Sequence, residues 1–237
     1  MITIYWGANT SASPEGIRAD APESILQKLF RHKNSKELVG DGDYKKCPAL
    51  IDELINVYGL KSYFDYTLQL GKDGVSSPDY DQEFFNRYFQ VKSSNLFFYR
   101  INFAFFTEEP SLEMSLLPAY MEDNNIVNNT IMLPGKIDIG KYFRGLHFAF
   151  HVKQNCTEIT FNRNEICYYV KFHTKKKLKF KQFLWTPKLE EMGLIMMAAK
   201  NNKYDFMNLD YYYNIFDRFN FKKKMIKIIK ENLCKEV

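Results

Sequence analysis

The run Leu96-Phe97-Phe98-Tyr99-Arg100-Ile101-Asn102-Phe103-Ala104-Phe105-Phe106 decides the fold class of this chain. One of its two alternating faces carries only large apolar or aromatic side chains: Phe97, Tyr99, Ile101, Phe103 and Phe105. Arg100 and Asn102 fall on the other face. A two-residue period is that of a β-strand, whose successive side chains point to opposite sides. The run therefore predicts one long strand that is buried on its aromatic face.

Strand patterns recur on both sides of this run. Further strands are predicted at 1–6, 55–60, 63–70, 111–117, 129–133, 146–152, 157–161, 167–172 and 178–184. Gly, Pro, Asn and Lys separate them at the short intervals typical of antiparallel sandwiches and jelly rolls. Aromatic residues make up 16% of the chain, which also favours strands. We predict an α+β fold whose centre, 88–185, is a jelly-roll-like antiparallel β-sandwich.

Helical spacing appears near both ends of the chain. A short apolar stripe after Pro22 predicts a helix that ends before Arg31, and 189–200 and 204–236 predict C-terminal helices. A chain of 237 residues commonly forms one unit. We therefore expect a single domain over 1–237, with an N-terminal layer (1–87), the β-sandwich (88–185) and C-terminal helices (186–237).

Composition excludes several classes of protein. The net charge of +5 comes mainly from Lys, and a chain also rich in Asn, Ile, Phe and Tyr has the bias of an AT-rich genome, so charge alone does not indicate a nucleic-acid partner. The N-terminus lacks the features of a signal peptide, and no run approaches the roughly 18 apolar residues of a membrane span. We expect a soluble intracellular protein without a membrane span.

The sequence contains no recognisable catalytic motif. Neither a Gly-x-Ser-x-Gly elbow nor a glycine-rich phosphate loop occurs, and the turn at Gly40–Asp43 is acidic. The four cysteines are far apart and form no Cys-x-x-Cys pair, so we expect reduced thiols, with Cys47 as a core or structural residue. We expect no cofactor and assign no catalytic residue.

Histidine spacing raises one metal hypothesis. His147 and His151 are four residues apart, as in a helical metal motif, but Leu146, Phe148, Phe150 and Val152 alternate with them and predict a strand. Four residues along a strand span roughly 13 Å, too far for two imidazoles to share one ion. The remaining metal hypothesis is a cupin-like pocket that joins His147 or His151 to His173. The alternative is that these histidines lie on a half-solvated strand.

Lysines gather near one predicted hairpin, 167–184. There Tyr169, Lys171 and His173 share one face of the first strand, and Lys177, Lys179 and Lys181 alternate with apolar residues in the second. An anionic partner would relieve the repulsion between these lysines, and a base could stack on Tyr169, which predicts a nucleic-acid interface. The alternative is that the lysines are solvated or protect an edge strand from pairing.

The C-terminal segment is also basic. Its lysines flank an apolar stripe at Lys222, Lys223, Lys224, Lys227 and Lys230. Such a helix can lie on a membrane surface or on a nucleic acid, but more often its stripe packs on its own domain.

Three runs carry a resemblance to a known group of proteins. They are Lys45-Lys46-Cys47-Pro48-Ala49-Leu50-Ile51-Asp52, Gly135-Lys136-Ile137-Asp138-Ile139-Gly140-Lys141-Tyr142-Phe143-Arg144 and Asn164-Glu165-Ile166-Cys167-Tyr168-Tyr169-Val170. Together with the basic C-terminal helix, they resemble uncharacterised proteins of tailed phages, especially marine ones. The resemblance implies a viral origin and no particular activity.

These observations lead to one functional expectation and two alternatives. We expect a non-enzymatic, phage-encoded protein that binds a protein partner or virion component and resides in the virion or the host cytoplasm. The alternatives are a nucleic-acid-binding protein and a metal-dependent enzyme with a cupin-like pocket.

Overall fold

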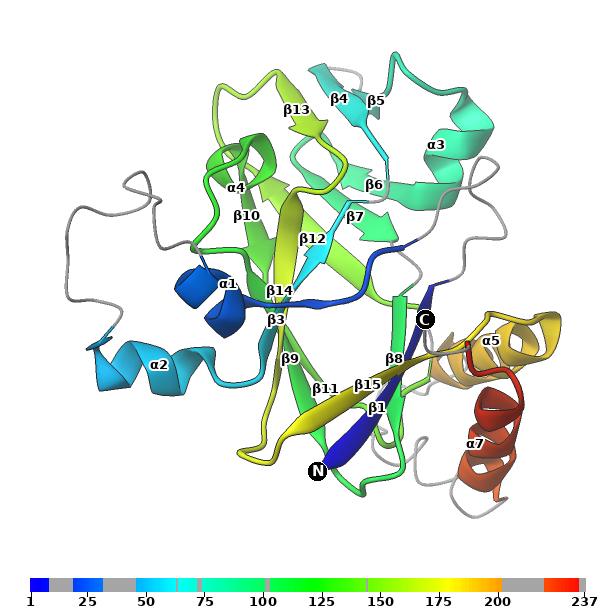
Figure 1. Cartoon of the computed structure of the whole chain (residues 1–237). Helices are drawn as coiled ribbons and strands as arrows, with labels where there is room; N and C mark the ends of the chain where they lie inside the picture. The colour runs from blue at the N-terminus through cyan, green and yellow to red at the C-terminus, as the bar shows by residue number, and fades with distance from the viewer. Residues whose placement is uncertain are drawn as a thin grey trace.

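The computed structural model describes residues 1–8, 19–31, 46–62, 64–71, 74–100, 103–143, 145–201 and 220–234. This part of the chain is mostly β-structure in several small sheets, and helices lie around them (Figure 1). Almost all neighbouring strands are antiparallel. The predicted β-rich α+β class with a C-terminal helix is therefore confirmed, whereas the jelly-roll connectivity stays a prediction.

The largest sheet has the strand order β11-β9-β14-β3-β2. Its strands are β2 (Glu23–Ser24), β3 (Val57–Lys61), β9 (Glu113–Pro118), β11 (Gly135–Asp138) and β14 (Ile166–Phe172). β14 is the central strand, hydrogen-bonded to β3 on one side and to β9 on the other. Nearly all of its residues are buried, because neighbours cover both of its faces.

A second sheet has the order β10-β12-β7-β6. It consists of β6 (Phe89–Ser93), β7 (Leu96–Arg100), β10 (Thr130–Leu133) and β12 (His147–Val152). Burial alternates along β7 and β12, as the sequence predicts for strands with one face on a core. Phe97 and Tyr99 pair with Phe150 and Phe148 on the inward face, and Arg100 pairs with His147 on the outward face.

Two smaller sheets complete the β-structure. One has the order β15-β1-β8 and contains β1 (Ile2–Ala8), β8 (Phe103–Thr107) and β15 (Leu178–Gln182). β1 and β15 are parallel, unlike the antiparallel pairs expected throughout. The other has the order β13-β4-β5 and contains β4 (Tyr66–Gly71), β5 (Gly74–Ser76) and β13 (Glu158–Phe161).

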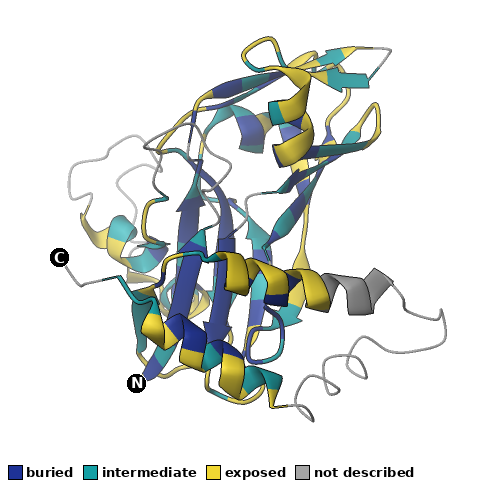
Figure 2. Ribbon diagram, turned by 90° about the vertical axis from the view of Figure 1, so that its right-hand side faces the viewer, coloured by how far each residue is buried: buried dark blue, intermediate teal, exposed yellow. Residues whose placement is uncertain are grey.

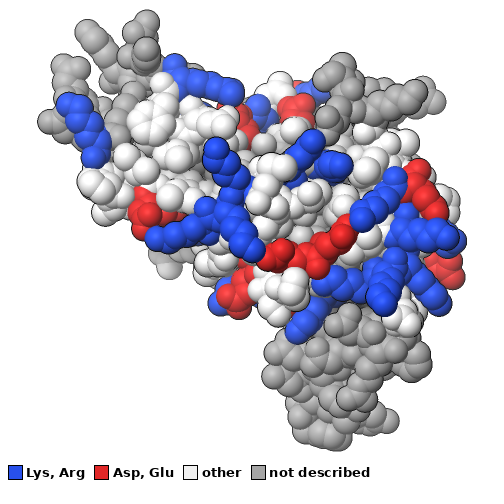
Figure 3. Space-filling model, turned by 60° about the horizontal axis from the view of Figure 1, so that its bottom comes forward, with Lys and Arg blue, Asp and Glu red and all other residues white. Residues whose placement is uncertain are grey.

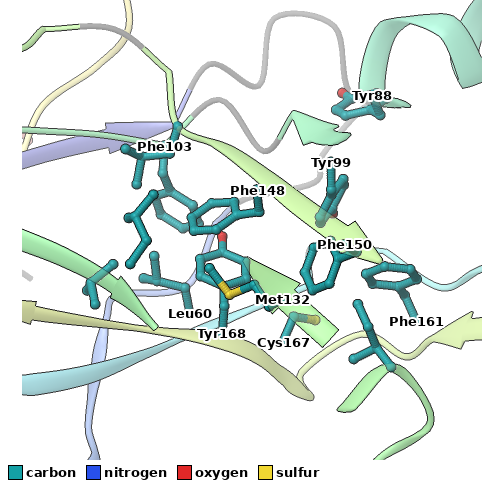
Figure 4. Packing of buried hydrophobic residues seen from close by; sticks show 14 of the residues in the cluster. Leu60, Tyr88, Tyr99, Phe103, Met132, Phe148, Phe150, Phe161, Cys167 and Tyr168 are labelled. Carbon is teal, nitrogen blue, oxygen red and sulfur yellow. The ribbon is translucent and has the colours of Figure 1, made fainter. Parts of the chain in front are cut away.

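The main core is built from aromatic rings between these sheets (Figure 4). The rings of Phe148 and Tyr168 stack with centroids 3.6 Å apart, which joins the second sheet to the first. Tyr66 stacks on Phe161 at 4.2 Å and contacts Tyr99 at 5.7 Å. The aromatic alternation that predicts strands therefore also supplies the inter-sheet contacts.

Helices cover other faces of the sheets. They are α1 (Ile25–Arg31), α2 (Pro48–Leu54), α3 (Gln82–Tyr88), α4 (Asn125–Asn129), α5 (Pro187–Asn201) and α7 (Phe221–Glu231). α5 and α7 lie against the sheet that contains β1 and β8, with their exposed sides outward (Figure 2). Met225, Ile228 and Ile229 of α7 are buried there, so the basic helix packs its apolar stripe on its own protein.

The structure corrects the long strand predicted at 96–106. β7 ends at Arg100 and β8 begins at Phe103, and the two strands belong to different sheets. Every residue of β8 is buried, because helices cover its second face. Alternation predicted strand structure correctly here but could not reveal that the chain changes sheets.

The predicted hairpin at 167–184 is also wrong. β14 pairs with β3 and β9, whereas β15 leaves that sheet and pairs with β1. Strands from the predicted N-terminal layer thus pair directly with strands from the predicted sandwich, and the two are interleaved. Single-domain organisation stays a prediction, and the turn at 40–43 and positions 204–219 of the last predicted helix lie outside the described residues.

Candidate functional site

The predicted metal ligands lie on different sheets. His147 and His151 are on the outward side of β12, where His151 Nε2 is 3.1 Å from Asn95 Nδ2. His173 follows β14 in the largest sheet, and its Nε2 is 2.7 Å from Ser115 Oγ. Within the part of the chain that the structure describes, no group of three or more His, Cys, Asp or Glu could hold a metal ion. The strand at His147–Val152 is confirmed, so the long separation expected between its two imidazoles also holds.

The predicted basic-aromatic face is not assembled as expected. Tyr169 is fully buried, and its hydroxyl donates a 2.9 Å hydrogen bond to Glu122. Burial, followed by the charge of Glu122, raises the pKa of Tyr169. Its face of β14 is covered by a cluster that includes Ile25 of α1 and Leu54 of α2. Tyr169 therefore has no exposed ring on which a base could stack, because the helices cover the face that alternation assigned to solvent.

Lys171 also lies in a different sheet from the other lysines of that face. Lys171 makes a 2.8 Å ion pair with Glu53, on the side of β14 that α2 covers. Lys179 and Lys181 lie on β15, beside β1, and Lys177 is exposed just before that strand. The structure does not place Lys171 in one patch with the three lysines at β15.

Acidic side chains accompany the lysines on the neighbouring surface. Figure 3 shows Lys and Arg interspersed with Asp and Glu on the face that looks downward in Figure 1. Ion pairs of 2.9 Å join Lys136 to Glu113 and Lys176 to Glu109. A surface with both signs of charge attracts a polyanion less strongly than the lysine content predicts.

The cysteines agree only in part with expectation. All four are free thiols, as predicted. Cys47 is exposed, not part of the core, and precedes Pro48, which starts α2. Cys167 is buried, and burial raises the pKa of its thiol, which makes it a poor nucleophile.

The structure adds a pocket that sequence reasoning missed. A cavity of about 410 Å³ lies between β5, α3, β6 and the end of β7. Its polar side chains are Gln82, Asn86, Gln90 and Arg100, and Phe85 and Phe89 contribute aromatic walls. The volume falls within the range of small-molecule sites.

Helix α3 supplies two of the amides. Asp81 caps the helix by accepting a 2.7 Å hydrogen bond from the backbone N–H of Phe84. Gln82 and Asn86 then lie one turn apart, and Gln82 Nε2 donates to Asn86 Oδ1 at 3.0 Å. This bond joins two exposed side chains at the rim of the pocket.

The register of β6 and β7 places the other two polar side chains, those of Gln90 and Arg100, at the pocket. Gln90 pairs with Phe98, and Arg100 follows Phe98 by two residues, so all three belong to the outward face of the sheet. Arg100 is the last residue of β7, where the sheet ends at the pocket. Among the described residues that line the pocket, Arg100 is the only charged one.

Arg100 also has an unmet hydrogen-bonding requirement. Its Nε is buried and has no hydrogen-bond partner among the described residues. A buried donor without an acceptor costs free energy, and a water, an ion or a ligand that brings an acceptor removes that cost. A planar oxyanion, above all a carboxylate, matches the donor fork of a guanidinium.

The sequence holds two signals for this site. Arg100 is a charged residue in an otherwise aromatic strand, and Phe84, Phe85, Tyr88 and Phe89 recur at helical spacing after Asp81. The second pattern predicts α3 once the N-cap is recognised. Nothing in the sequence, however, brings α3 to the end of β7.

Comparison with known proteins adds no assignment: no family model matches the chain, and no match was found among curated proteins or among solved structures. Among the described helices, none is long and apolar enough to cross a membrane.

Proposed function

We propose that this protein acts by binding, and that the pocket at Arg100 recognises an anionic group of its ligand. The observation that supports the proposal is Arg100, whose side chain lines the pocket and whose Nε lacks an acceptor among the described residues; the described residues that line the pocket include no carboxylate. A ligand oxyanion in the pocket would pair with the guanidinium of Arg100, which the structure leaves partly exposed.

The surrounding side chains fit a small organic anion. Gln82, Asn86 and Gln90 can each donate or accept hydrogen bonds, so they can orient polar atoms beside the charged group. Phe85 and Phe89 lie beneath these groups and are almost fully buried. A pocket with a few polar groups and one guanidinium suits a ligand with an anionic head.

We also propose the biological role that the sequence predicts. A non-enzymatic, phage-encoded protein that works in the virion or against a host component would use such a pocket to recognise a partner or a small ligand. A jelly-roll-like sandwich would present the pocket at one end of a sheet, where loops and helix ends commonly carry function.

Calorimetric titration with matched small molecules tests the proposal. Benzoate and benzamide have the same ring and nearly the same shape, but only benzoate is charged. We expect benzoate to bind and benzamide to bind about 10- to 100-fold more weakly, because hydrogen bonds to charged groups contribute about 1.5–3 kcal/mol. Equal affinities for the two compounds would contradict anion recognition.

A pair of arginine variants locates the binding. Arg100→Gln is expected to remove the preference for benzoate. Arg87→Gln is the matched control, because Arg87 lies on α3 and pairs with Glu83 at its surface. Circular dichroism checks that both variants fold. Retained benzoate binding in folded Arg100→Gln would remove Arg100 from the proposed role.

A further inference from the structure

An apolar path continues from the pocket across the outward face of the second sheet. Phe98 on β7 lies opposite Ala149 on β12, and Ala149 lies opposite Leu133 on β10. On the other side, Phe98 lies opposite Gln90, which lines the pocket. Because neighbouring strands are about 4.8 Å apart, this row crosses the whole sheet as one continuous strip.

The far end of the row is open to solvent. Leu133 is 47% exposed, and Ile131, which is two residues away on the same side of β10, is 54% exposed. Phe98 and Ala149 are half-buried. Single exposed apolar residues are ordinary, but here they adjoin one another across strands and lead to a charged pocket.

The formal charges on this face have one sign. The four strands place Arg100 and Lys92 on it, together with the imidazoles of His147 and His151, Gln90 and the apolar row. Among the described residues of these strands, no carboxylate lies on the outward face. The face therefore complements an anion, and its apolar strip complements a hydrocarbon chain.

We propose that the ligand is an apolar monocarboxylate, with its carboxylate on Arg100 and its hydrocarbon chain along Phe98, Ala149 and Leu133. This inference rests on the proposed anion-binding function and names the class of ligand. A carboxylate is favoured over a phosphate because the described residues that line the pocket offer one guanidinium and no second cation. A planar carboxylate accepts two parallel hydrogen bonds from one guanidinium, whereas phosphate sites commonly add lysines or backbone N–H groups.

A homologous series of straight-chain carboxylates tests the inference on the full chain. Acetate, butanoate, hexanoate and octanoate share one head group and differ only in length. Each methylene removed from water is expected to raise affinity by about twofold to fourfold. Octylamine and inorganic phosphate serve as controls for the sign and the shape of the head group, and both are expected to bind much more weakly than octanoate.

Two leucine variants test where the hydrocarbon chain of the ligand binds. Leu133→Asp puts a carboxylate at the exposed end of the strip and is expected to reduce the gain from hexanoate to octanoate, while leaving acetate binding unchanged. Leu194→Asp is the matched control, because Leu194 is 54% exposed on α5, away from this sheet. A gain with chain length that survives in folded Leu133→Asp would overturn the proposed path.

The outcomes separate this inference from the proposed function. If benzoate binding depends on Arg100 but affinity does not rise with the length of the straight-chain carboxylate, the proposed hydrocarbon path is wrong and the proposed anion binding stands. Tighter binding of phosphate than of octanoate would reject the monocarboxylate as the ligand class but would leave the proposed anion binding in place. If no anion in either experiment depends on Arg100, both proposals fail.

Discussion

His147 lies directly opposite Arg100 in the antiparallel pair of β12 and β7. The two residues are far apart in sequence, and each belongs to the polar, outward side of its strand. Their register places an imidazole beside the guanidinium, at the end of the sheet where the pocket opens. The two side chains therefore meet through strand pairing and not through proximity in the sequence.

A first prediction concerns Gly7 on β1. A Cβ at this position would lie 2.5 Å from a ring carbon of Phe183, which must then move. Gly7→Ala is expected to lower the free energy of unfolding by about 1–3 kcal/mol, as overpacking commonly does. Urea denaturation measures the change. Gly135→Ala is the control, because its Cβ would meet only Leu116 at 3.7 Å. Equal effects of the two substitutions would contradict the close contact.

A second prediction concerns the buried hydroxyl of Tyr169. It donates to Glu122, which also accepts from Lys28 Nζ at 2.7 and 2.8 Å. Tyr169→Phe keeps the ring and removes this one hydrogen bond, so we expect a loss of about 1.5–3 kcal/mol in unfolding free energy. Tyr120→Phe is the control, because the Tyr120 side chain is about half exposed. A stability unchanged by Tyr169→Phe would show that the hydrogen bond contributes nothing.

A third prediction concerns the effect of low pH on the stability of helix α7. Hydrogen bonds from Lys230, and then from Tyr5, lower the pKa of Glu108 below its ordinary value of 4.5. A lowered folded-state pKa stabilises the protein above the unfolded-state pKa, and this contribution disappears as pH falls through the folded-state value. We expect α7, which carries Lys230, to lose hydrogen-exchange protection below about pH 4.5.

Hydrogen exchange of 221–231 between about pH 6 and about pH 3 measures this effect, after correction for the intrinsic rate. Glu108→Gln cannot ionise, so its corrected protection is expected to depend less on pH. The loss of protection is small, because both side chains are half exposed. The same pH dependence in the variant would assign the effect to another carboxylate.

A fourth prediction tests the nucleic-acid hypothesis. If Lys177 and Lys181 contact phosphates, replacing each with Gln should reduce the slope of log affinity against log salt by about one. Tyr169→Phe should leave the affinity unchanged, because that ring is buried. Fluorescence anisotropy with a labelled single strand, at several salt concentrations, measures both. Absence of binding at low salt would end the hypothesis.

Local patterns predicted many of the elements. Alternation at 146–152 and 167–172 corresponds to β12 and β14, and the apolar stripe near Ile25 corresponds to α1. These predictions succeed because side-chain periodicity and backbone geometry are coupled within a few residues. α2 and α3 were missed, although Pro48 and Asp81 supply their start signals, because each helix is short and its stripe is aromatic or mixed.

Pairing between distant segments could not be predicted in the same way. The sequence by itself determined that 96–100 and 103–106 are extended, that aromatic rings face a core and that Arg100 lies on the opposite face of its strand. The tertiary structure decided that this run divides between two sheets, that β15 joins β1 and that Tyr169 is covered by helices. It alone brings Arg100 to α3, because which strands and helices meet depends on the packing of whole surfaces and not on the period of any one segment.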